Sequence, residues 1–281
     1  IESSDLSLLF DEKKNLFSIG YNTDDEILNS SHYDMLMSEA RITSFFAIAK
    51  KLVPVSHWGA LSRRLGSLHS YKGPVSWTGT MFEYFMPEIF LSSTVGSLGY
   101  EALRFCLYVQ RSYAEKLNVP YGISESGIYS FDADLNYQYK ANGVQRIALK
   151  SHMNDDVVVS PYSSYLSLPF CTKAAMNNLS ILNKMGMFGR FGFYESVDFT
   201  SKRVGGKSFE LIKSFIAHHI GMIILAVDNA INNGIIQKRF LSDRQMKSAK
   251  ELLQEKITNG TELYNEPYTE KVTRMNESEV T

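Results

Sequence analysis

Apolar residues recur at intervals of three and four positions through most of the chain beyond residue 31. Residues at this spacing share one face of a helix, so the pattern predicts helices that pack through apolar faces around a common core. The predicted helices cover residues 32–51, 57–65, 79–91, 98–117, 161–185, 208–234 and 243–256, with a break expected near Pro169. We therefore expect an all-α fold.

The remaining segments divide the chain into three predicted parts. Residues 1–30 hold two short extended stretches, LSLLF and LFSIGYN, around the charged turn DEKK, and form an N-terminal extended segment. Residues 31–256 form the helical domain, and residues 257–281 a polar C-terminal tail. Within the domain, residues 119–160 are rich in Tyr, Asn, Asp and Gly, and we expect a long excursion with a short hairpin that lines a site.

Length, charge and composition exclude several classes of protein. The 281 residues are 44% hydrophobic, enough for the core of one large domain or two small ones. The 29 basic and 30 acidic residues give a formal charge of −1, which offers no positive field to nucleic acid or an anionic membrane. No uninterrupted apolar run is long enough to span a bilayer, so we expect no direct membrane insertion by this segment. The chain begins at Ile1 without a signal-peptide pattern, and we expect it to be a piece of a longer protein.

Glu125 is the first candidate for chemistry, because it lies in a loop of sequence VPYGISES. Gly and Pro punctuate this stretch, and a carboxyl on such a turn is placed where a ligand can reach it. Glu39 is the second candidate, within the predicted helix 32–51. At helical spacing its neighbours are apolar, so its carboxyl should face the core and either have a partner or carry a raised pKa. Two carboxyls in different settings are what acid/base chemistry on a glycosidic bond requires.

His218 and His219 lie in the apolar segment IAHHIGM of a predicted helix. Adjacent helical residues point about 100° apart, so one metal ion would not take both rings, and no third ligand stands at suitable spacing. Two interpretations remain open. The histidines are core residues that hydrogen-bond a backbone or a carboxylate, or one of them steers a sugar hydroxyl or a catalytic acid.

Glu195 and Asp198 stand three residues apart in GFYESVDFT, with Arg203 just beyond. A surface turn with a local salt bridge would explain all three. However, aromatic residues surround both acids in the sequence, which is an unusual setting for solvated charge. A place in the site is therefore an equally good hypothesis.

Glu83 and Arg41 also have structural explanations. Thr80 followed by Glu83 fits a capping box at the start of the predicted helix 79–91. Arg41 shares a predicted helix face with Asp34 and Ser38. That face is polar, so it either faces solvent or lines a polar cleft.

Six motifs occur here in the order in which they occur in the glucoamylase-like domain of cyclic β-1,2-glucan synthases, which this chain resembles over roughly residues 30 to 255. They are SEARITSFFAIAK, SWTGTMFEYFMPEIFL, VPYGISES, VSPYSSYLSLPF, GFYESVDFT and AHHIGM. Relatives of that domain include endo-β-1,2-glucanases built on an (α/α) toroid of the six-hairpin glycosidase type. The resemblance implies this toroid, with long loops and short strands on one face. The predicted helices are too few for a full toroid, so we expect an excised part or a trimmed member.

The resemblance also implies a function: a glycoside hydrolase or transglycosylase that cuts and rejoins β-1,2-glucan with retention at the anomeric carbon. It assigns the chemistry to the Glu of SEAR, Glu39, and the Glu of GISES, Glu125. The chemistry requires no metal and no organic cofactor. The candidates for stacking on sugar rings are Trp77, Tyr84, Tyr121, Tyr139 and Tyr194, and those for orienting the acids are Arg41 and Arg203.

The expected partners are a β-1,2-glucan and the other domains of a larger synthase. In the synthases a membrane-associated glycosyltransferase region precedes this domain and a phosphorylase-like region follows it. The resemblance therefore places this segment, as a soluble part of a membrane-associated protein, on the cytoplasmic side of a bacterial inner membrane.

Two positions depart from the family pattern and keep an alternative open. Tyr121 stands where many relatives have Trp, a conservative change for sugar stacking, and Ile220 stands where they usually have Gln. The loss of a polar group beside the histidines favours a non-catalytic domain that holds glucan for neighbouring synthase domains. The retained acids in SEAR and GISES favour an enzyme, whose acceptor is either water or a sugar hydroxyl.

Overall fold

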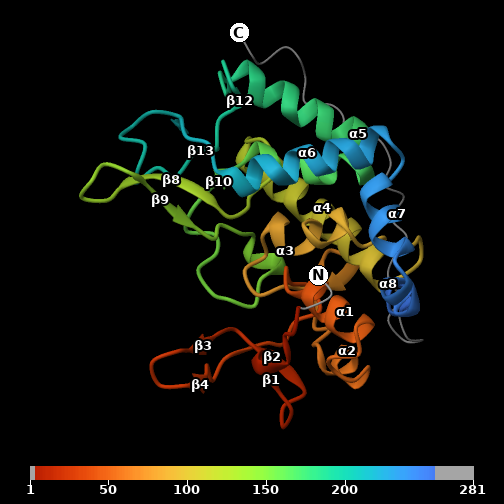
Figure 1. Ribbon diagram of the computed structural model, residues 1–281. Helices are drawn as coiled ribbons and strands as arrows, with labels where there is room; N and C mark the ends of the chain where they lie inside the picture. Colours follow the sequence, from red (N-terminus) through yellow and green to blue (C-terminus); the bar gives the residue numbers. More distant parts are fainter. Residues whose placement is uncertain (1–3, 257–281) are drawn as a thin grey trace.

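A computed structural model describes residues 4–256, so the predicted tail 257–281 lies outside the described residues (Figure 1). Helices fill the centre and one side of the molecule, and short strand pairs lie on the other side and at the N-terminal end. The helices are α1 (Arg41–Ala49), α2 (Ser56–Ala60), α3 (Met81–Phe85), α4 (Leu98–Leu117), α5 (Pro161–Lys184), α6 (Ala217–Ile231), α7 (Ile235–Ser242) and α8 (Arg244–Ser248). Short 3-10 helices cover Ser7–Leu9, Pro87–Ile89, Gln145–Ile147 and Lys250–Gln254.

The expectation of an all-α fold was too narrow, because the described residues also form small antiparallel sheets. β1 (Phe10–Asp11), β2 (Leu16–Ser18) and β5 (His32–Tyr33) make one sheet, and β10 (Val158–Val159), β13 (Ser196–Asp198) and β14 (Glu210–Ile212) make another. The hairpins are β3 (Tyr21–Asn22) with β4 (Ile27–Leu28), β6 (Leu65–Leu68) with β7 (Tyr71–Pro74), β8 (Ser126–Phe131) with β9 (Tyr137–Lys140), and β11 (Phe188–Gly189) with β12 (Gly192–Phe193).

The two longest helices confirm the helical pattern. α4 matches the predicted 98–117, with Ser97 capping its start and Asn118 ending it in the left-handed conformation. α5 matches the predicted 161–185, and the backbone leaves helical geometry at Cys171, two residues after Pro169. α5 and α6 run beside each other above α4 (Figure 1).

Two predicted helices begin later than expected. Residues 32–37 are extended and residues 38–40 form a turn, because the backbone at Leu36 donates to the carbonyl of Ser62 and Met37 forms a bridge with Ser76. Residues 208–216 contain β14, whose Leu211 pairs with Val197 of β13. Short apolar runs fit either a strand or a helix, and in both cases pairing with a distant segment decided the outcome.

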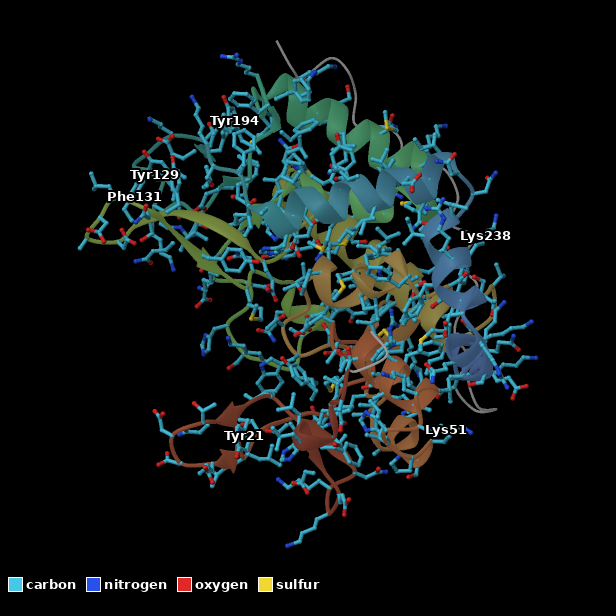
Figure 2. All side chains as sticks on the ribbon, viewed as in Figure 1. Tyr21, Lys51, Tyr129, Phe131, Tyr194 and Lys238 are labelled. Atoms are coloured by element: carbon cyan, nitrogen blue, oxygen red, sulfur yellow. The ribbon has the colours of Figure 1, made fainter. Side chains whose placement is uncertain are left out.

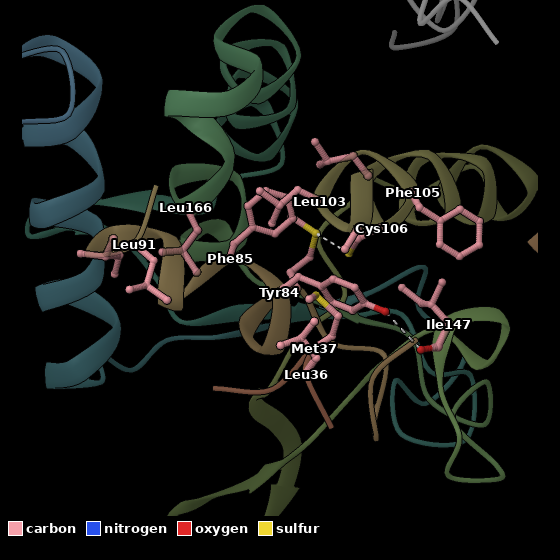
Figure 3. Packing of buried hydrophobic residues seen from close by; sticks show 14 of the residues in the cluster. Leu36, Met37, Tyr84, Phe85, Leu91, Leu103, Phe105, Cys106, Ile147 and Leu166 are labelled. Atoms are coloured by element: carbon pink, nitrogen blue, oxygen red, sulfur yellow. Dashed lines mark hydrogen bonds between the residues drawn. The ribbon is translucent and has the colours of Figure 1, made fainter. Parts of the chain in front are cut away.

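The core gathers around α4, whose Leu103, Phe105 and Cys106 are fully buried. Figure 3 shows Leu103 and Cys106 beside Phe85 and Tyr84 of α3, whereas the ring of Phe105 packs on Tyr71. α3 and the loop before β8 therefore both pack against α4.

The predicted hairpin within residues 119–160 is confirmed as β8 and β9. Figure 2 shows Tyr129 and Phe131 on this hairpin, on the side of the molecule opposite Lys51 and Lys238. Within residues 4–256, no single helix combines the length and apolar composition that crossing a bilayer requires. α6 and α7 reach that composition and length only when added together across a bend of 94°.

Candidate active site

Two side-chain amides, one on α4 and one on α5, hold the loop that carries Glu125 through hydrogen bonds to its backbone. Gln110 of α4 donates from Nε2 to the carbonyl of Ile123 at 2.9 Å and accepts from its N–H at 3.0 Å. Asn178 of α5 makes the same kind of pair with Tyr121, at 2.8 and 3.1 Å. A primary amide matches a peptide group donor for acceptor, so each pair fixes the loop in position and orientation.

Tyr162 of α5 holds the next two residues of the loop. Its hydroxyl lies 2.8 Å from Ser124 Oγ and 2.9 Å from the carbonyl oxygen of Glu125. Ser124 Oγ also accepts from the N–H of Phe82 in α3, at 2.9 Å. The backbone of Glu125 is thus fixed by α3 and α5, and its side chain leaves the loop just before β8.

The carboxyl of Glu125 is half-buried and holds its proton unusually tightly. Burial, followed by the nearby carboxylates of Glu39 and Glu83, raises the pKa of Glu125 to about 7. A hydrogen bond donated by the hydroxyl of Tyr139 acts in the opposite direction. At neutral pH this carboxyl therefore exists in both protonation states, as a general acid requires.

Glu39 lies beside Glu125, but the secondary structure that places it there differs from the expected helix. It precedes α1 rather than lying on a helix, in the turn that follows the extended residues 32–37. Burial raises the pKa of Glu39, and so does Glu83, whereas its own N–H and the Ser38 hydroxyl, at 3.3 Å, act against them. Burial, followed by the charges of Glu39 and Glu125, also raises the pKa of the half-buried Tyr33 on β5.

Glu83 is the structural member of this group of acids. The predicted capping box is confirmed: Thr80 accepts from the N–H of Glu83, and the Glu83 carboxylate accepts from the N–H of Thr80 at 3.1 Å. The same carboxylate accepts from Ser76 Oγ at 2.8 Å and from the N–H of Thr78 at 3.0 Å. These donors fix the position of the Glu83 carboxylate, whose negative charge raises the pKa of both Glu39 and Glu125.

His219 and Glu195 form a buried pair next to this group. His219 Nδ1 lies 2.9 Å from Glu195 Oε1, and the N–H of Gly127 donates to the same oxygen at 3.3 Å. On the other side of the ring, His219 Nε2 lies 3.4 Å from the hydroxyl of Tyr139. Because Tyr139 also bonds to Glu125, the pair is connected to the candidate acid through one tyrosine.

The two adjacent histidines occupy opposite environments in the first turn of α6. His219 is 2% exposed, and its ring stacks on Tyr162. His218 is exposed, and burial of its ring together with the neighbouring His219 lowers its pKa. The interpretation of a histidine bonded to a carboxylate therefore applies to His219 alone.

Asp198 and Arg203 belong to a separate ion-pair network. Arg203 Nε lies 2.6 Å from Asp198, which is fully buried, and its Nη1 lies 2.5 Å from Asp156. Burial would raise the pKa of Asp156, but the hydrogen bonds from Lys140 and Arg203 lower it to about 2. The salt bridge expected between Asp198 and Arg203 is present, with Arg203 half-buried in the turn that follows β13, but Asp198 is fully buried on β13 and not in a surface turn. The network joins β9 to β13 and so fixes the hairpin that carries Tyr139.

Arg41 and Asp34 correct the expected polar helix face. Arg41 is buried, with Nη2 at 2.9 Å from Glu88 and 3.2 Å from the carbonyl of Tyr84. Burial lowers the pKa of this guanidinium, and Glu88 acts against that shift. Asp34 is exposed in the extended segment. The bonds of Arg41 to Glu88 and Tyr84 tie α1 to the 3-10 helix Pro87–Ile89 and to α3, so Arg41 orients the fold near the site.

The five aromatic candidates divide by exposure. Trp77 and Tyr139 are 55% and 46% exposed, and their rings are open to a ligand. Tyr84 is fully buried in the core (Figure 3), and its hydroxyl donates to the carbonyl of Pro74 at 3.0 Å. Tyr121 is 7% exposed beneath the loop it belongs to. Tyr194 is half-buried, and its ring lies 5.7 Å from that of Phe215, in the region labelled in Figure 2.

Sequence reasoning missed the residues that hold the site together, namely Gln110, Asn178 and Tyr162. Each is a buried side chain with a polar group in one of the two longest helices, and Gln110 and Asn178 have apolar residues at helical spacing on both sides. Buried polar side chains need partners, so their positions were a usable signal of a backbone segment packed against α4 and α5.

Within the described residues, this group of acids forms no candidate metal site and does not line the hollow beside α2. Residues 4–256 bring together no cluster of three or more His, Cys, Asp or Glu side chains that could hold a metal ion. A hollow lined by Trp58, Arg63 and Glu255 lies beside α2. Its described lining does not include Glu39 or Glu125.

Comparison with known proteins places this arrangement in a family. Residues 31–244 match the profile of the Glycoamylase family, described as "Putative glucoamylase". The chain belongs to the glycoamylase family. The family segment contains Glu39, Glu125, Glu195 and His219, so the whole group of acids lies within it.

Among curated proteins, this glycoamylase-family chain is similar to the cyclic β-(1,2)-glucan synthase NdvB of Rhizobium meliloti. The two are 37% identical over 255 residues, which is 90% of this chain and 9% of NdvB. The chain therefore spans a small part of the curated relative it matches.

Among solved structures, the glycoamylase-family fold is similar to a putative glucoamylase from Bacteroides caccae, with a TM-score of 0.65 and 17% identity over 90% of this chain and 62% of that one. It is also similar to an endo-β-1,2-glucanase from Chitinophaga pinensis in complex with sophorotriose and glucose. That match has a TM-score of 0.63 and 14% identity over 85% of this chain and 59% of that one. These likenesses establish the shared fold, and the chain spans less than two thirds of either structure.

Proposed function

We propose that this domain is a glycosidase or transglycosylase that acts on β-1,2-linked glucan as part of a cyclic β-1,2-glucan synthase. The observation that carries the proposal is the setting of Glu125. Its carboxyl is half-buried, has a pKa of about 7, and lies next to the ionisable Glu39. The similarity to NdvB supports the choice of glucan, and the glucanase from Chitinophaga pinensis supports the choice of linkage.

In this mechanism Glu125 is the general acid. A carboxyl with a pKa of about 7 keeps its proton in much of the population at neutral pH, and it can transfer that proton to the departing glycosidic oxygen. Glu39 is the second carboxylate. Retention at the anomeric carbon requires two displacements, so Glu39 would attack the anomeric carbon first. The deprotonated Glu125 would then take the proton of the acceptor hydroxyl, which belongs to a sugar or to water. The negative charge of Glu83 favours the protonated form of Glu125 before the reaction.

The glucan would lie against the exposed rings near this pair. Tyr139 and Trp77 offer open aromatic faces, which suit stacking on sugar rings. Tyr84, Tyr121, Asp198, Arg41 and Arg203 are buried or half-buried and support the loops and strands that bring the reacting groups together. Glu195 and His219 support Tyr139.

The larger protein determines where this reaction takes place. Since the chain matches 9% of NdvB, further domains would deliver and remove the glucan. By analogy with the bacterial synthases, the domain would lie on the cytoplasmic side of the inner membrane. The division into parts at residues 30 and 256 stays a prediction.

The test is incubation of the domain with linear β-1,2-glucan, followed by separation of the products by size and by linkage analysis. Shorter, longer or cyclic products are expected, and they must disappear in Glu125→Gln. Glucan binding without any product would contradict the enzyme and establish the alternative, a non-catalytic module that holds glucan for neighbouring domains. That alternative is favoured by Ile220, which places no polar group beside the histidines. Loss of turnover in chelator would instead indicate a metal-dependent reaction.

A further inference from the structure

A chain of hydrogen bonds runs from the buried Glu195 to the candidate acid. Glu195 bonds to His219 Nδ1 at 2.9 Å, His219 Nε2 lies 3.4 Å from the Tyr139 hydroxyl, and Tyr139 bonds to Glu125. These residues come from the bend just before β13, from α6, from β9 and from the loop before β8. The four side chains come from segments that are far apart in the sequence, so their arrangement depends on the tertiary fold.

The proton count of this chain permits two arrangements. The Tyr139 hydroxyl has one proton, and the carboxylate of Glu195 keeps a proton on His219 Nδ1. If His219 Nε2 is also protonated, it donates to the Tyr139 oxygen, and Tyr139 donates to the ionised Glu125. If Nε2 is bare, it accepts from Tyr139, and a protonated Glu125 donates to the Tyr139 oxygen. Both arrangements hold the same number of protons, and they differ by one proton moved from Glu125 to His219 through Tyr139.

We infer that Glu195 and His219 are positioning residues that orient the Tyr139 hydroxyl and, through it, exchange a proton with Glu125. The catalytic part of this inference rests on the proposed function. The effect on the proton affinity of Glu125 does not, because it can be measured without substrate.

The construction of the pair is more specific than a core contact requires. His219 is fixed in plane by the ring of Tyr162, with centroids 3.9 Å apart, and Glu195 takes a further bond from the N–H of Gly127. Tyr139 is 46% exposed, so the second ring nitrogen of His219 bonds to a side chain at the surface and not to one in the core.

Other titratable groups face this chain from the elements around it. They are His218 on α6, Tyr162 on α5, Tyr33 on β5, Glu39 before α1 and Glu83 on α3. The experiment therefore compares variants at fixed positions and does not assign a single titration to a single group.

The test is the titration of Glu125 by NMR with ¹³C-labelled glutamate carboxyls, with the signal assigned by its loss in Glu125→Gln. Tyr139→Phe removes a donor to the charged form, so the Glu125 titration should move to higher pH. Glu195→Gln should move it in the same direction by a smaller amount, because His219 loses the charge that favours protonation at Nε2. A direct Coulombic effect of Glu195 would have the opposite sign, since loss of a nearby negative charge lowers the pKa of a carboxyl.

The double variant Tyr139→Phe/Glu195→Gln separates the relay from a structural role. If the pair acts through Tyr139, the double variant should titrate like Tyr139→Phe alone. Additive shifts, or a shift to lower pH in Glu195→Gln, would overturn the inference. His219→Asn is the second variant, because its amide can still bond to Glu195 but is too short to reach Tyr139. It should move the Glu125 titration to higher pH, and thermal melts check that each variant folds.

Turnover gives the second measurement. The alkaline limb of the rate of β-1,2-glucan turnover should shift with the NMR titration in every variant, and kcat should fall by up to about 10²-fold, the cost of a small misplacement in an active site. KM should stay near that of the parent. A parent without turnover would contradict the proposed function and leave the NMR result to decide the inference.

Discussion

The ring of Tyr162 stacks on the imidazole of His219, with centroids 3.9 Å apart and 20° between the planes. The hydroxyl of the same tyrosine lies 2.9 Å from the carbonyl oxygen of Glu125. One side chain of α5 therefore supports both the backbone of the candidate acid and the ring of the buried histidine.

Tyr162→Phe should keep the stack and lose the two hydroxyl contacts. Ser124 and Glu125 would each lose a buried partner, so the free energy of unfolding should fall by about 1–2 kcal/mol. Turnover should fall with it, because the Glu125 loop loses one of its attachments. Tyr165→Phe on the same helix is the matched control, since its half-buried ring lies against Phe193. Equal denaturant midpoints for the two variants would rule out the supporting role of the hydroxyl.

Glu125→Gln should abolish the acid while keeping the shape of the side chain. Turnover of β-1,2-glucan should fall by about 10²–10⁴-fold, and glucan binding should persist. In the parent the rate should decrease as pH rises through about 7, the pKa of Glu125, and this alkaline limb should be missing in the variant. Glu115→Gln, at an exposed position near the end of α4, controls for the charge change. Unchanged turnover in Glu125→Gln would remove this residue from the mechanism.

The raised pKa of Glu125 also predicts how stability depends on pH. The folded protein binds the proton more tightly than the unfolded chain, whose carboxyl has a pKa near 4.5. The contribution is therefore fully present below pH 4.5 and is lost as the pH rises to about 7. Between these values the parent should lose on the order of 2 kcal/mol relative to Glu125→Gln in denaturant unfolding. Parallel curves for the two proteins would contradict the shift.

Arg203→Met should destabilise the fold strongly. It would leave the buried carboxylates of Asp198 and Asp156 without their shared cation, at a cost of about 3–5 kcal/mol. Adding Asp198→Asn should restore part of the loss, because one buried charge is removed. Arg239→Met, at an exposed position of α7, should melt like the parent. A small effect in Arg203→Met would show that the network is solvated.

The adjacent histidines should differ in their effect on stability. His219→Ala removes a buried ring bonded to Glu195, and should cost about 1–3 kcal/mol. His218→Ala changes an exposed side chain, and should stay within about 0.5 kcal/mol of the parent. Thermal or denaturant unfolding of the two variants measures the difference, and a larger loss in His218→Ala would reverse the assignment.

Local sequence was sufficient where an element depends on its own residues. α4 and α5 are long, periodic and bounded by capping signals, and the capping box of Glu83 involves residues three positions apart. It was insufficient where distant segments compete for the same backbone. The segment before Arg41 has apolar residues at helical spacing, yet it pairs with Ser62 and Ser76 and becomes extended.

The same limit applies to the site. The motifs around Glu39 and Glu125 indicated both carboxyls. No spacing could indicate that Glu195 and His219, 24 residues apart, meet through a strand and a helix. The burial of Tyr84 and Arg41 was hidden for the same reason, because helix faces do not reveal which neighbour covers them.

The paired hydrogen bonds between Gln110 and Ile123 bear on whether the Glu125 loop must move before a substrate can bind. The Ile123 amide is enclosed against α4, so its proton can exchange with water only when the loop separates from that helix. Such an opening would break the core around α4, and its free energy should approach that of global unfolding. We therefore expect the Glu125 loop to open as rarely as the core around α4, so that a substrate would meet an acid already in place without waiting for a lid to close.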